Sequence, residues 1–475
     1  MEKLSDAQLD RVIQALESIV SKEYISTNLF ERIKNTLDVF PYELEKGQVC
    51  HAVVMPGSKN ETSEIMKYCN SISMPVFIRG SGTHLGGAYR PHIPGIVVNT
   101  HRLNKIEVFE EYGFFECEAG CVMGKVADHL AELGYFLPMA PGSRDIATMG
   151  GLIANNTSGH IVDSSIGKPG DYVLGLEVVL PNGDIIETGT KGLRRPAGTE
   201  LTRFFLGGDG LLGVITKIRM RLVPAMKKAY GLAVYNDLLS LARGVQRMYL
   251  ERRPIPLFME FLDAKSTKIG FGLRGLEAPE GAVNMFVNIG QTEQETSEKV
   301  DMVLESLRAE GAIDAYQVKD ADTWHKIWSS REVIGSNLMQ QRGEQLKSAE
   351  IVSNLRDLIL CMEDCINFTQ GLPLLSQLDL YLFGHIGALT FHPACLIPRH
   401  WENDKRRRAI DELYQRDTEL NLKYSTCGGE WGQFGKRKDF FVKRYGERSY
   451  EIVKELKKMF DPNNILNPGI LEGYR

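Results

Sequence analysis

The sequence predicts an α+β protein with at least two domains. Its 475 residues exceed what one hydrophobic core usually holds. A strand–helix–strand pattern over residues 52–78 runs directly into a glycine-rich loop, which is an α+β or α/β opening. After Pro224 the pattern changes to a second series of alternating helices and strands. We therefore expect the first large domain to end near residue 224.

The elements of the first half follow from apolar spacing and turn residues. Leu9, Val12 and Leu16 recur at helical spacing, so residues 1–40 are expected to form two helices. Further helices are expected over residues 59–71 and 123–133. Short apolar runs predict strands over residues 52–56, 75–78, 95–99, 115–119, 172–180, 184–188 and 214–222. The turn residues 181–183, Pro-Asn-Gly, predict a hairpin between two of these strands.

The second half predicts another α+β domain followed by a helical end. Helices are expected over residues 237–251, 293–310, 354–367, 402–420 and 445–460. Strands are expected over residues 257–262, 281–289 and 378–381. Trp324, Trp328 and Arg331 lie close together in this half, and a short block at residues 383–393 carries two histidines.

The bulk composition excludes several classes of protein. The formal net charge of -5 offers no electrostatic reason to expect nucleic acid as a partner. No apolar stretch reaches the roughly 20 residues of a membrane span, and the charged N-terminus does not resemble a signal peptide. The eight cysteines are scattered without the spacing of a zinc or iron–sulfur site. We expect a cytoplasmic protein without an integral membrane segment.

The glycine-rich loop at residues 79–87 is suited to binding an anion. Its glycines allow successive backbone N–H groups to point inward around a phosphate, and Arg79 adds a positive charge. The next glycine after Gly80 and Gly82 is Gly86, so the loop is not the G-x-G-x-x-G of nicotinamide cofactors. It also lacks the Gly-Lys-Ser/Thr ending of a P-loop.

A second small-residue segment, residues 149–159, is suited to an extended cofactor lying against the main chain. Gly150 and Gly151 permit close approach and positive φ, and Asn155 and Ser158 can hydrogen-bond without bulk or charge. The alternative is an ordinary polar turn between two elements. A third segment, residues 207–213, matches G-x-G-x-x-G but precedes a strand, so we interpret that match as accidental for dinucleotide binding.

Four segments, in this order along the chain, resemble the signatures of the FAD-linked oxidase family that includes vanillyl-alcohol oxidase. They are residues 75–87 (PVFIRGSGTHLGG), 147–159 with 173–189, 207–216 (GGDGLLGVIT), and the C-terminal residues 460–469. Within that family the chain is most similar to the branch of D-lactate dehydrogenase and the glycolate oxidase flavoprotein subunit. Asp209 stands where the family usually has glutamate.

The resemblance implies a non-Rossmann FAD-binding domain of two α+β subdomains with an α+β cap domain. The implied organisation is N-terminal helices at 1–44, the FAD-binding domain at 45–224, a cap or substrate domain at 225–435, and a C-terminal segment at 436–475 that returns to the FAD domain. The implied FAD-binding residues are Arg79, Gly80, Ser81, Gly82, Thr83, His84, Pro141, Gly142, Thr148, Gly150, Gly151, Ala154, Asn155, Ser158, Gly159, Gly213, Ile215 and Asn467. His84 also raises covalent flavin attachment, although the flavin-linked histidine of relatives falls at the position of Thr83.

His385 and His392 resemble the metal-site histidines of this family, and Glu430 resembles its metal-site carboxylate, so the resemblance implies a metal site. Two neutral imidazoles and a carboxylate suit a divalent Zn, Mn or Fe ion with positions open for substrate. Such an ion would hold an α-hydroxy acid by its hydroxyl and carboxylate oxygens and lower the hydroxyl pKa. The alternative is a pair of structural histidines in an apolar segment.

The expected catalytic residues are Arg331, Glu430 and Trp431. Arg331 resembles the arginine that binds the substrate carboxylate in this branch, which suits a bidentate guanidinium. Trp431 departs from the branch, which has a proton-accepting histidine after the glutamate. Residues 388–390, Ala-Leu-Thr, replace the family's Asp-Gly-Asn. Candidate replacement bases are His325, His84 and Tyr381.

We therefore expect an FAD-dependent dehydrogenase that takes a hydride from a hydroxy acid or related alcohol. Its electrons would pass to a protein partner, such as an electron-transfer flavoprotein or an iron–sulfur subunit, and an oligomer is possible. Two alternatives stay open. One is a flavoprotein oxidase of an aromatic alcohol or phenol that uses O₂, and the other is a flavin electron-relay subunit of a complex.

Overall fold

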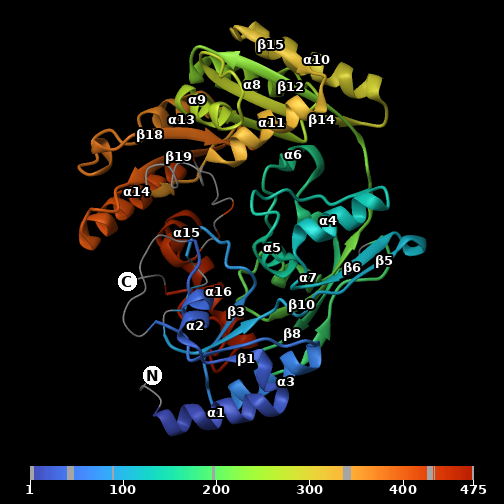
Figure 1. Cartoon of the computed structure of the whole chain (residues 1–475), viewed down its shortest axis with the longest axis vertical. Coiled ribbons are helices and arrows are strands. Elements are labelled where there is room, and N and C mark those ends of the chain that lie inside the picture. Colours follow the sequence, from blue (N-terminus) through green and yellow to red (C-terminus); the bar gives the residue numbers. More distant parts are fainter. Residues whose placement is uncertain are drawn as a thin grey trace. The chain divides into compact units, whose positions relative to one another are not determined.

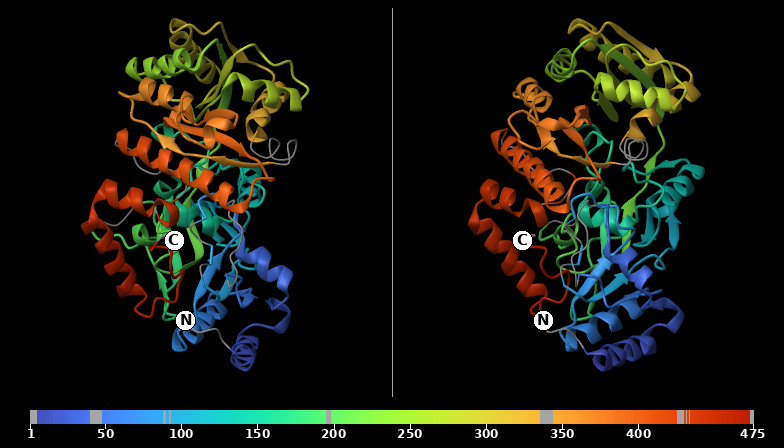
Figure 2. Two further views of the ribbon diagram at one scale, coloured as in Figure 1. Left: turned by 90° about the vertical axis from the view of Figure 1, so that its left-hand side faces the viewer. Right: turned by 60° about the vertical axis from the view of Figure 1, so that its left-hand side comes forward.

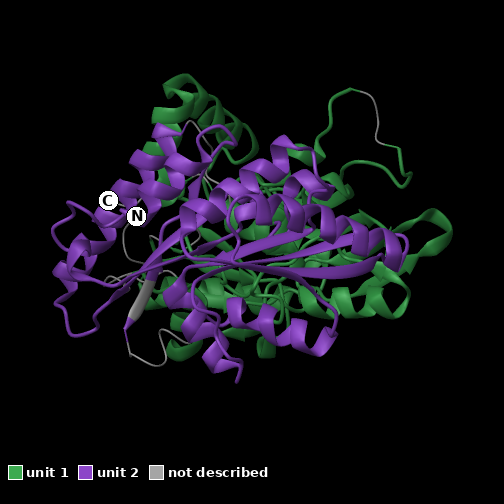
Figure 3. Cartoon of the chain, turned by 90° about the horizontal axis from the view of Figure 1, so that it is seen from above, with its two compact units in different colours: residues 1–157, 168–224, 431–475 green, residues 158–167, 225–430 purple. Residues whose placement is uncertain are grey.

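The computed structural model describes residues 5–39, 48–87, 90–91, 93–194, 198–334, 344–424, 430, 432 and 434–472 (Figures 1 and 2). The chain divides into two compact units (Figure 3). Unit 1 comprises residues 1–157, 168–224 and 431–475, and unit 2 comprises residues 158–167 and 225–430. Both units combine helices with sheets, so the predicted α+β class is confirmed. None of the described helices is long and apolar enough to cross a membrane.

The first part of unit 1 is a small sheet with helices packed against it. The strand order is β1-β2-β4-β3, with β2, β4 and β3 parallel. Its elements are α1 (Asp6–Ile19), β1 (Ile25–Ser26), α2 (Leu29–Thr36), β2 (Ala52–Val54), α3 (Lys59–Ser71), β3 (Val76–Arg79) and β4 (Ile96–Asn99). Ser5 caps α1 and Ser58 caps α3 by accepting hydrogen bonds from backbone N–H groups of the first turn.

The second part of unit 1 is a five-stranded antiparallel sheet in the order β5-β6-β10-β8-β9. Its strands are β5 (Ile106–Phe109), β6 (Phe114–Glu118), β8 (Val173–Val179), β9 (Ile185–Glu187) and β10 (Val214–Arg221), while β7 (Tyr135–Phe136) pairs with β11 (Val223–Pro224). Its helices are α4 (Met123–Glu132), α5 (Met149–Asn155) and α7 (Thr202–Phe205). The predicted hairpin at residues 181–183 joins β8 to β9.

The C-terminal helices belong to the core of unit 1. They are α15 (Lys438–Tyr445) and α16 (Glu447–Phe460), drawn in red in Figure 2. Phe441 and Tyr450 are buried in the same hydrophobic cluster as Phe205 and Ile215. After α16, Asn467 accepts a hydrogen bond from the backbone N–H of Ile78 at 3.1 Å and donates one to the carbonyl of Gly210 at 2.8 Å. One asparagine thus connects three of the segments on which the family resemblance rests.

Residues 149–159 begin as a helix and end in a turn. Gly150 and Gly151 do not adopt positive φ, because residues 149–155 form helix α5. Positive φ occurs instead at Asn156 (55°) and Gly159 (66°), which end the helix and turn the chain. A Cβ on Gly150 would lie 2.7 Å from that of Ala119, so this glycine allows α5 to pack closely on the end of β6.

Unit 2 is built on an antiparallel sheet in the order β15-β12-β14-β13-β18-β19-β16, and β17 also pairs with β19. Its strands are β12 (Lys227–Tyr235), β13 (Phe258–Leu262), β14 (Ala282–Gly290), β15 (Asp314–Val318), β16 (Gln345–Ser348), β17 (Ile351–Val352), β18 (Leu380–Gly384) and β19 (Thr390–Ile397). Its helices are α6 (Asp163–Ile166), α8 (Leu238–Leu250), α9 (Ala264–Leu273), α10 (Glu293–Ala309), α11 (Ala321–Glu332), α13 (Leu358–Ile366) and α14 (Asn403–Lys423).

Alternate residues of β12 face helices on opposite sides of this sheet. Leu232 and Val234 share a hydrophobic cluster with Phe271 of α9 and Trp324 of α11. The neighbouring Tyr235 instead donates a hydrogen bond to the carbonyl of Leu307 in α10. The α9–α11 face is the one that carries Arg331.

Several elements of unit 2 were absent from the expectations, and two of them, β12 and α9, contain a glycine at a close contact. In β12, Gly231 lies opposite Phe286, and a Cβ there would lie 2.2 Å from the Phe286 ring. In α9, a Cβ on Gly270 would lie 2.5 Å from the carbonyl oxygen of Ser330 in α11. Glycine lowers intrinsic strand and helix propensity, yet both positions require it for close packing.

Candidate functional site

A turn between two strands brings His385 and His392 together. His385 follows β18, His392 lies on β19, and Phe383 pairs directly with His392 across the hairpin. At the turn, Gly384 has φ of +158° and passes so close to the carbonyl of Thr390 that a Cβ would lie 2.4 Å from it. The two imidazole rings therefore lie with centroids 5.1 Å apart and nearly perpendicular.

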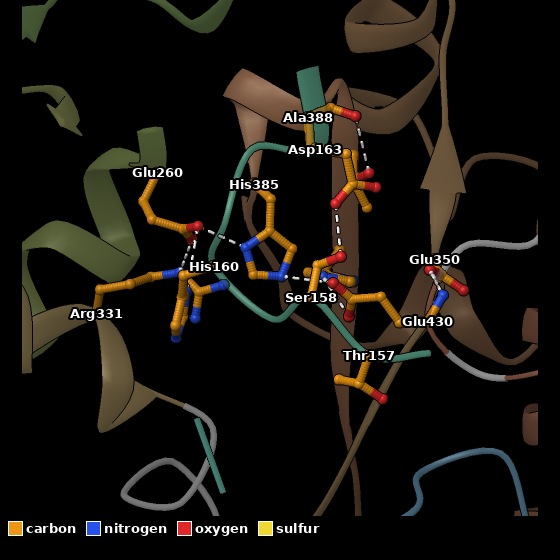
Figure 4. A network of polar contacts seen from close by, with 12 residues as sticks. Thr157, Ser158, His160, Asp163, Glu260, Arg331, Glu350, His385, Ala388 and Glu430 are labelled. Carbon is orange, nitrogen blue, oxygen red and sulfur yellow. Dashed lines mark hydrogen bonds and ion pairs between the residues drawn. The ribbon is translucent and has the colours of Figure 1, made fainter. Parts of the chain in front are cut away.

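Glu430 completes this group. One carboxylate oxygen, Oε1, lies 3.0 Å from Nε2 of His385, and the other, Oε2, lies 3.8 Å from Nε2 of His392. The backbone N–H of Glu430 donates a hydrogen bond to buried Glu350, which holds this residue at the site (Figure 4). Both histidines are buried, whereas the Glu430 side chain is 28% exposed, so the group opens on the side of the carboxylate.

Protonation differs between the two histidines. Burial lowers the pKa of His392 to about 4, so its imidazole is neutral near pH 7. Burial also acts to lower the pKa of His385, but the carboxylates of Glu260 and Glu430 outweigh it and raise the pKa to about 10. Burial opposes ionisation of Glu430, yet the adjacent His385 lowers the Glu430 pKa to about 2.

This donor set fits a divalent metal. His385, His392 and Glu430 each offer one ligand atom, and these atoms lie within 4.8 Å of one another. Two imidazole nitrogens and one carboxylate oxygen form a three-ligand site of the kind that leaves positions for substrate or water. The sequence predicted these three residues, and the structure brings all three together.

The structure adds two residues that the sequence did not single out, Glu260 and His160. Glu260 lies on β13 with no exposed side-chain surface, and its Oε1 accepts a hydrogen bond from Nδ1 of His385 at 2.5 Å. Nδ1 of His160 lies 3.2 Å from the same oxygen. A lone glutamate in the apolar run Phe-Met-Glu-Phe-Leu was the available signal, because buried carboxylates are rare unless paired.

Arg331 joins the same network from α11. Its Nε donates to Oε2 of Glu260 at 2.8 Å, and its guanidinium carbon lies 4.9 Å from the centre of the Phe383 ring. The side chain is 9% exposed. Its two terminal nitrogens make no hydrogen bond with any described residue, which leaves them available for an anionic ligand.

Of the remaining proposed catalytic positions, the structure describes the three candidate bases but not Trp431. Trp431 lies outside the residues that the structure describes. Among the candidate bases, His325 is exposed on α11, Tyr381 is buried in the hydrophobic cluster of unit 2, and His84 belongs to unit 1. The substituted residues Ala388, Leu389 and Thr390 form the turn between β18 and β19, where Leu389 has φ of 55°.

The expected cofactor loop follows β3 directly. Arg79 ends that strand and donates to the carbonyl of Lys34, while Ser81 contacts His101 and the carbonyl of Ile146. In the same loop Nδ1 of His84 accepts a hydrogen bond from the N–H of Gly86. Gly82 has φ of +69°, and Thr83 continues the loop.

Thr148 provides the observation that fits a cofactor at this loop. It is the residue before α5, and a Cβ on Gly80 would lie 2.1 Å from its hydroxyl oxygen, so the two predicted segments touch. The hydroxyl of Thr148 is buried and has no hydrogen-bond partner among the described residues. This hydroxyl is therefore able to form a hydrogen bond with a cofactor at the loop.

The remaining predicted cofactor residues are distributed over both units. In unit 1, Pro141 and Gly142 lie in the loop before α5, Gly150, Gly151, Ala154 and Asn155 lie within α5, Gly213 precedes β10, Ile215 lies on β10, and Asn467 follows α16. Ser158 and Gly159 belong to unit 2, where the hydroxyl of Ser158 donates to Asp163 at 2.5 Å.

Comparison with known families places the chain in one class. Residues 50–189 match an FAD binding domain, and residues 225–471 match the C-terminal domain of FAD linked oxidases. The second match alone covers more than half of the chain. The chain therefore belongs to the FAD-linked oxidase family and is an FAD-dependent oxidoreductase.

Individual relatives agree with this family. The glycolate oxidase subunit GlcD of Bacillus subtilis is 32% identical over 427 residues, covering 88% of each chain. A D-lactate dehydrogenase of Archaeoglobus fulgidus is 30% identical, covering 88% of this chain and 90% of that protein. Among solved structures, p-cresol methylhydroxylase has the same fold, with a TM-score of 0.79 at 16% identity over 99% of this chain and 98% of that one.

Proposed function

We propose that this protein is an FAD-dependent dehydrogenase that oxidises the CH–OH group of a 2-hydroxy acid. The observation that carries the proposal is the arrangement in unit 2, where Glu260 connects Arg331 to the ligand group formed by His385, His392 and Glu430. A cation-binding group beside a buried arginine with free terminal nitrogens suits a ligand that has both a hydroxyl and a carboxylate. The names of the glycolate and D-lactate relatives support the same substrate class.

Different residues would bind different parts of such a substrate. His385, His392 and Glu430 would hold a divalent Zn, Mn or Fe ion, which supplies Lewis-acid polarisation of the substrate hydroxyl when bound. Arg331 would pair with the substrate carboxylate through its two terminal nitrogens. The flavin supplies the acceptor for the hydride, and the residues predicted around Gly80 and Thr148 would hold it.

The geometry favours a hydroxy acid over the aromatic-alcohol alternative. That alternative rested on Trp431, which the described residues do not include. Arg331, in contrast, lies beside the ligand group and has no obvious use with a neutral phenol. We also propose that the electrons pass to an electron-transfer flavoprotein or an iron–sulfur subunit, since the cysteine spacing predicts no cluster in this chain. A cytoplasmic location remains part of the proposal.

Anaerobic reduction of the flavin tests the function. Purified protein would be mixed with glycolate, D-lactate, D-2-hydroxyglutarate and L-lactate, and with benzyl alcohol and 4-methylphenol, while the flavin absorbance is recorded. We expect at least one 2-hydroxy acid to bleach the flavin and the neutral alcohols to leave it oxidised. Bleaching by the neutral alcohols alone would contradict the proposal.

A further inference from the structure

We propose that Glu260 is a positioning residue that fixes the metal ligand His385 and the substrate-binding Arg331 through a single buried carboxylate. The inference rests on the proposed function and concerns a residue outside the proposed ligand set of His385, His392 and Glu430. Figure 4 shows dashed lines from Glu260 to His385 and toward Arg331, and its two oxygens face these different partners.

The first oxygen determines how His385 binds. Oε1 of Glu260 accepts the hydrogen bond from Nδ1 of His385 at 2.5 Å. Because Glu260 holds the proton on Nδ1, the nitrogen that gives up its proton to a binding metal is Nε2, which faces Glu430 at 3.0 Å. Glu260 thereby selects the tautomer and the ring orientation that a metal requires. Carboxylates that orient a metal-binding histidine in this way affect metal affinity by about 10–100-fold.

The second oxygen determines how Arg331 is presented. Oε2 of Glu260 binds only the Nε position, at 2.8 Å, and leaves the two terminal nitrogens of the guanidinium without a described partner. Phe383 packs on the guanidinium at 4.9 Å and restricts its rotation. The Nε side of the Arg331 guanidinium is therefore fixed by Glu260 and Phe383, and its two terminal nitrogens can pair with a ligand.

Burial makes this arrangement specific to a charged carboxylate. Glu260 has no exposed side-chain surface, so its charge persists only because cationic or hydrogen-bonding partners surround it. His160 is the third partner, with Nδ1 at 3.2 Å from Oε1 and its ring edge-on to both His385 and Trp328. A glutamine at position 260 would keep the volume but could not accept at both oxygens.

The Glu260 carboxylate thus contributes to both metal binding and substrate binding. Any change at Glu260 is expected to alter metal retention through His385 and substrate affinity through Arg331 at the same time. A change at Arg331 should alter only substrate affinity, because the bond from Glu260 to His385 stays. This difference between the two residues separates a positioning role from a general effect on folding.

The experiment compares metal affinity in matched variants. Wild type, Glu260→Gln, Glu260→Asp, Arg331→Gln and the surface control Glu251→Gln would be freed of metal with a chelator and titrated with Mn²⁺, with bound FAD and thermal unfolding recorded as folding checks. We expect the Mn²⁺ dissociation constant to rise about 10–100-fold in Glu260→Gln, less in Glu260→Asp, and to stay within about twofold of wild type in the Arg331 and Glu251 variants. Unchanged Mn²⁺ affinity in folded Glu260→Gln would overturn the inference.

A charge-matched double variant covers the case in which Glu260→Gln does not fold. Glu260→Gln combined with Arg331→Gln leaves no unpaired buried charge, and we expect it to lose Mn²⁺ affinity as the single Glu260 variant does. Wild type that binds Mn²⁺ but is not reduced by any hydroxy acid would defeat the proposed function alone, and the comparison of affinities would still decide the role of Glu260. Wild type that binds neither Mn²⁺ nor Zn²⁺ would defeat both.

Discussion

Nε2 of His385 lies 3.0 Å from Oε1 of Glu430, so a histidine from the β18–β19 turn and a glutamate 45 positions later in the chain, 430 − 385, share one ion pair. His392 lies beside this pair as a neutral imidazole, because burial lowers the His392 pKa to about 4. These three side chains contain the donor atoms for a metal and are the basis of the first prediction.

We predict that His385→Ala and Glu430→Gln each abolish stoichiometric metal binding. Each change removes one of three ligands, and a two-ligand remnant cannot hold a first-row ion firmly. Zn, Mn and Fe content after purification would be measured by elemental analysis, with His325→Ala as the control because His325 is exposed on α11. Equal metal content in His385→Ala and wild type would remove the metal from the proposal.

We predict that Arg331→Lys raises KM for 2-hydroxy acids about 10–100-fold, equivalent to roughly 1.5–3 kcal/mol for a hydrogen bond to a charged group. Lysine keeps the charge but cannot form the bidentate pair with a carboxylate. Steady-state assays with an artificial electron acceptor would give KM and kcat, and Arg356→Lys, at a side chain that is 89% exposed, serves as the control. A KM equal to that of wild type would show that Arg331 does not bind the carboxylate.

The sequence could predict the members of the site that lie in recognisable segments, but not their connection. His385, His392 and Arg331 were identified from motifs, and the α+β class followed from the order of helices and strands. Glu260 could not be assigned, because its partners lie 71 and 125 positions away and only the sheet and α11 bring them together. Likewise, helix α5 over residues 149–155 packs through Gly150 on Ala119, a contact that local composition does not reveal.

We predict that Thr148→Val weakens FAD binding about 5–30-fold, the equivalent of roughly 1–2 kcal/mol for one lost hydrogen bond. The hydroxyl of Thr148 is buried without a described partner beside Gly80, and valine has nearly the same shape without the hydroxyl. Titration of flavin-free protein with FAD, followed by flavin fluorescence, would give the dissociation constant. Thr199→Val, at an exposed position, should bind FAD like wild type, and equal affinity in Thr148→Val would remove that residue from the cofactor site.

We predict that Asn467→Ala destabilises unit 1 by about 2–4 kcal/mol, because it leaves the N–H of Ile78 and the carbonyl of Gly210 without their partner. Asn467 also adopts φ of 44°, a left-handed conformation in which alanine is strained. Thermal unfolding would be compared with Asn463→Ala, at an exposed residue of the same turn. If both variants unfold at the same midpoint as wild type, the hydrogen bonds of Asn467 do not stabilise unit 1.

The last prediction concerns acid stability in the five-stranded sheet. Glu116 of β6 lies opposite Arg219 of β10, which donates to it from Nε at 2.8 Å, and Nζ of Lys217 lies 3.0 Å away. Burial acts to raise the pKa of Glu116, but Lys217 and Arg219 outweigh it and hold the pKa below its usual value. A carboxyl group whose pKa is lower in the folded than in the unfolded state stabilises the fold above its unfolded pKa of about 4.3.

Glu116→Gln should therefore be less stable than wild type at pH 7 by about 1 kcal/mol or less, the scale of one cross-strand charge pair. The difference should shrink as the pH falls below about 4 and Glu116 of the wild type takes up its proton. Denaturant unfolding at pH 7, 5 and 3.5 would measure it, with Glu111→Gln at an exposed position as the control. A difference that stays constant or grows toward low pH would contradict a stabilising carboxylate at Glu116. A carboxyl group whose pKa is lowered by folding can only lose its stabilising effect as the pH falls.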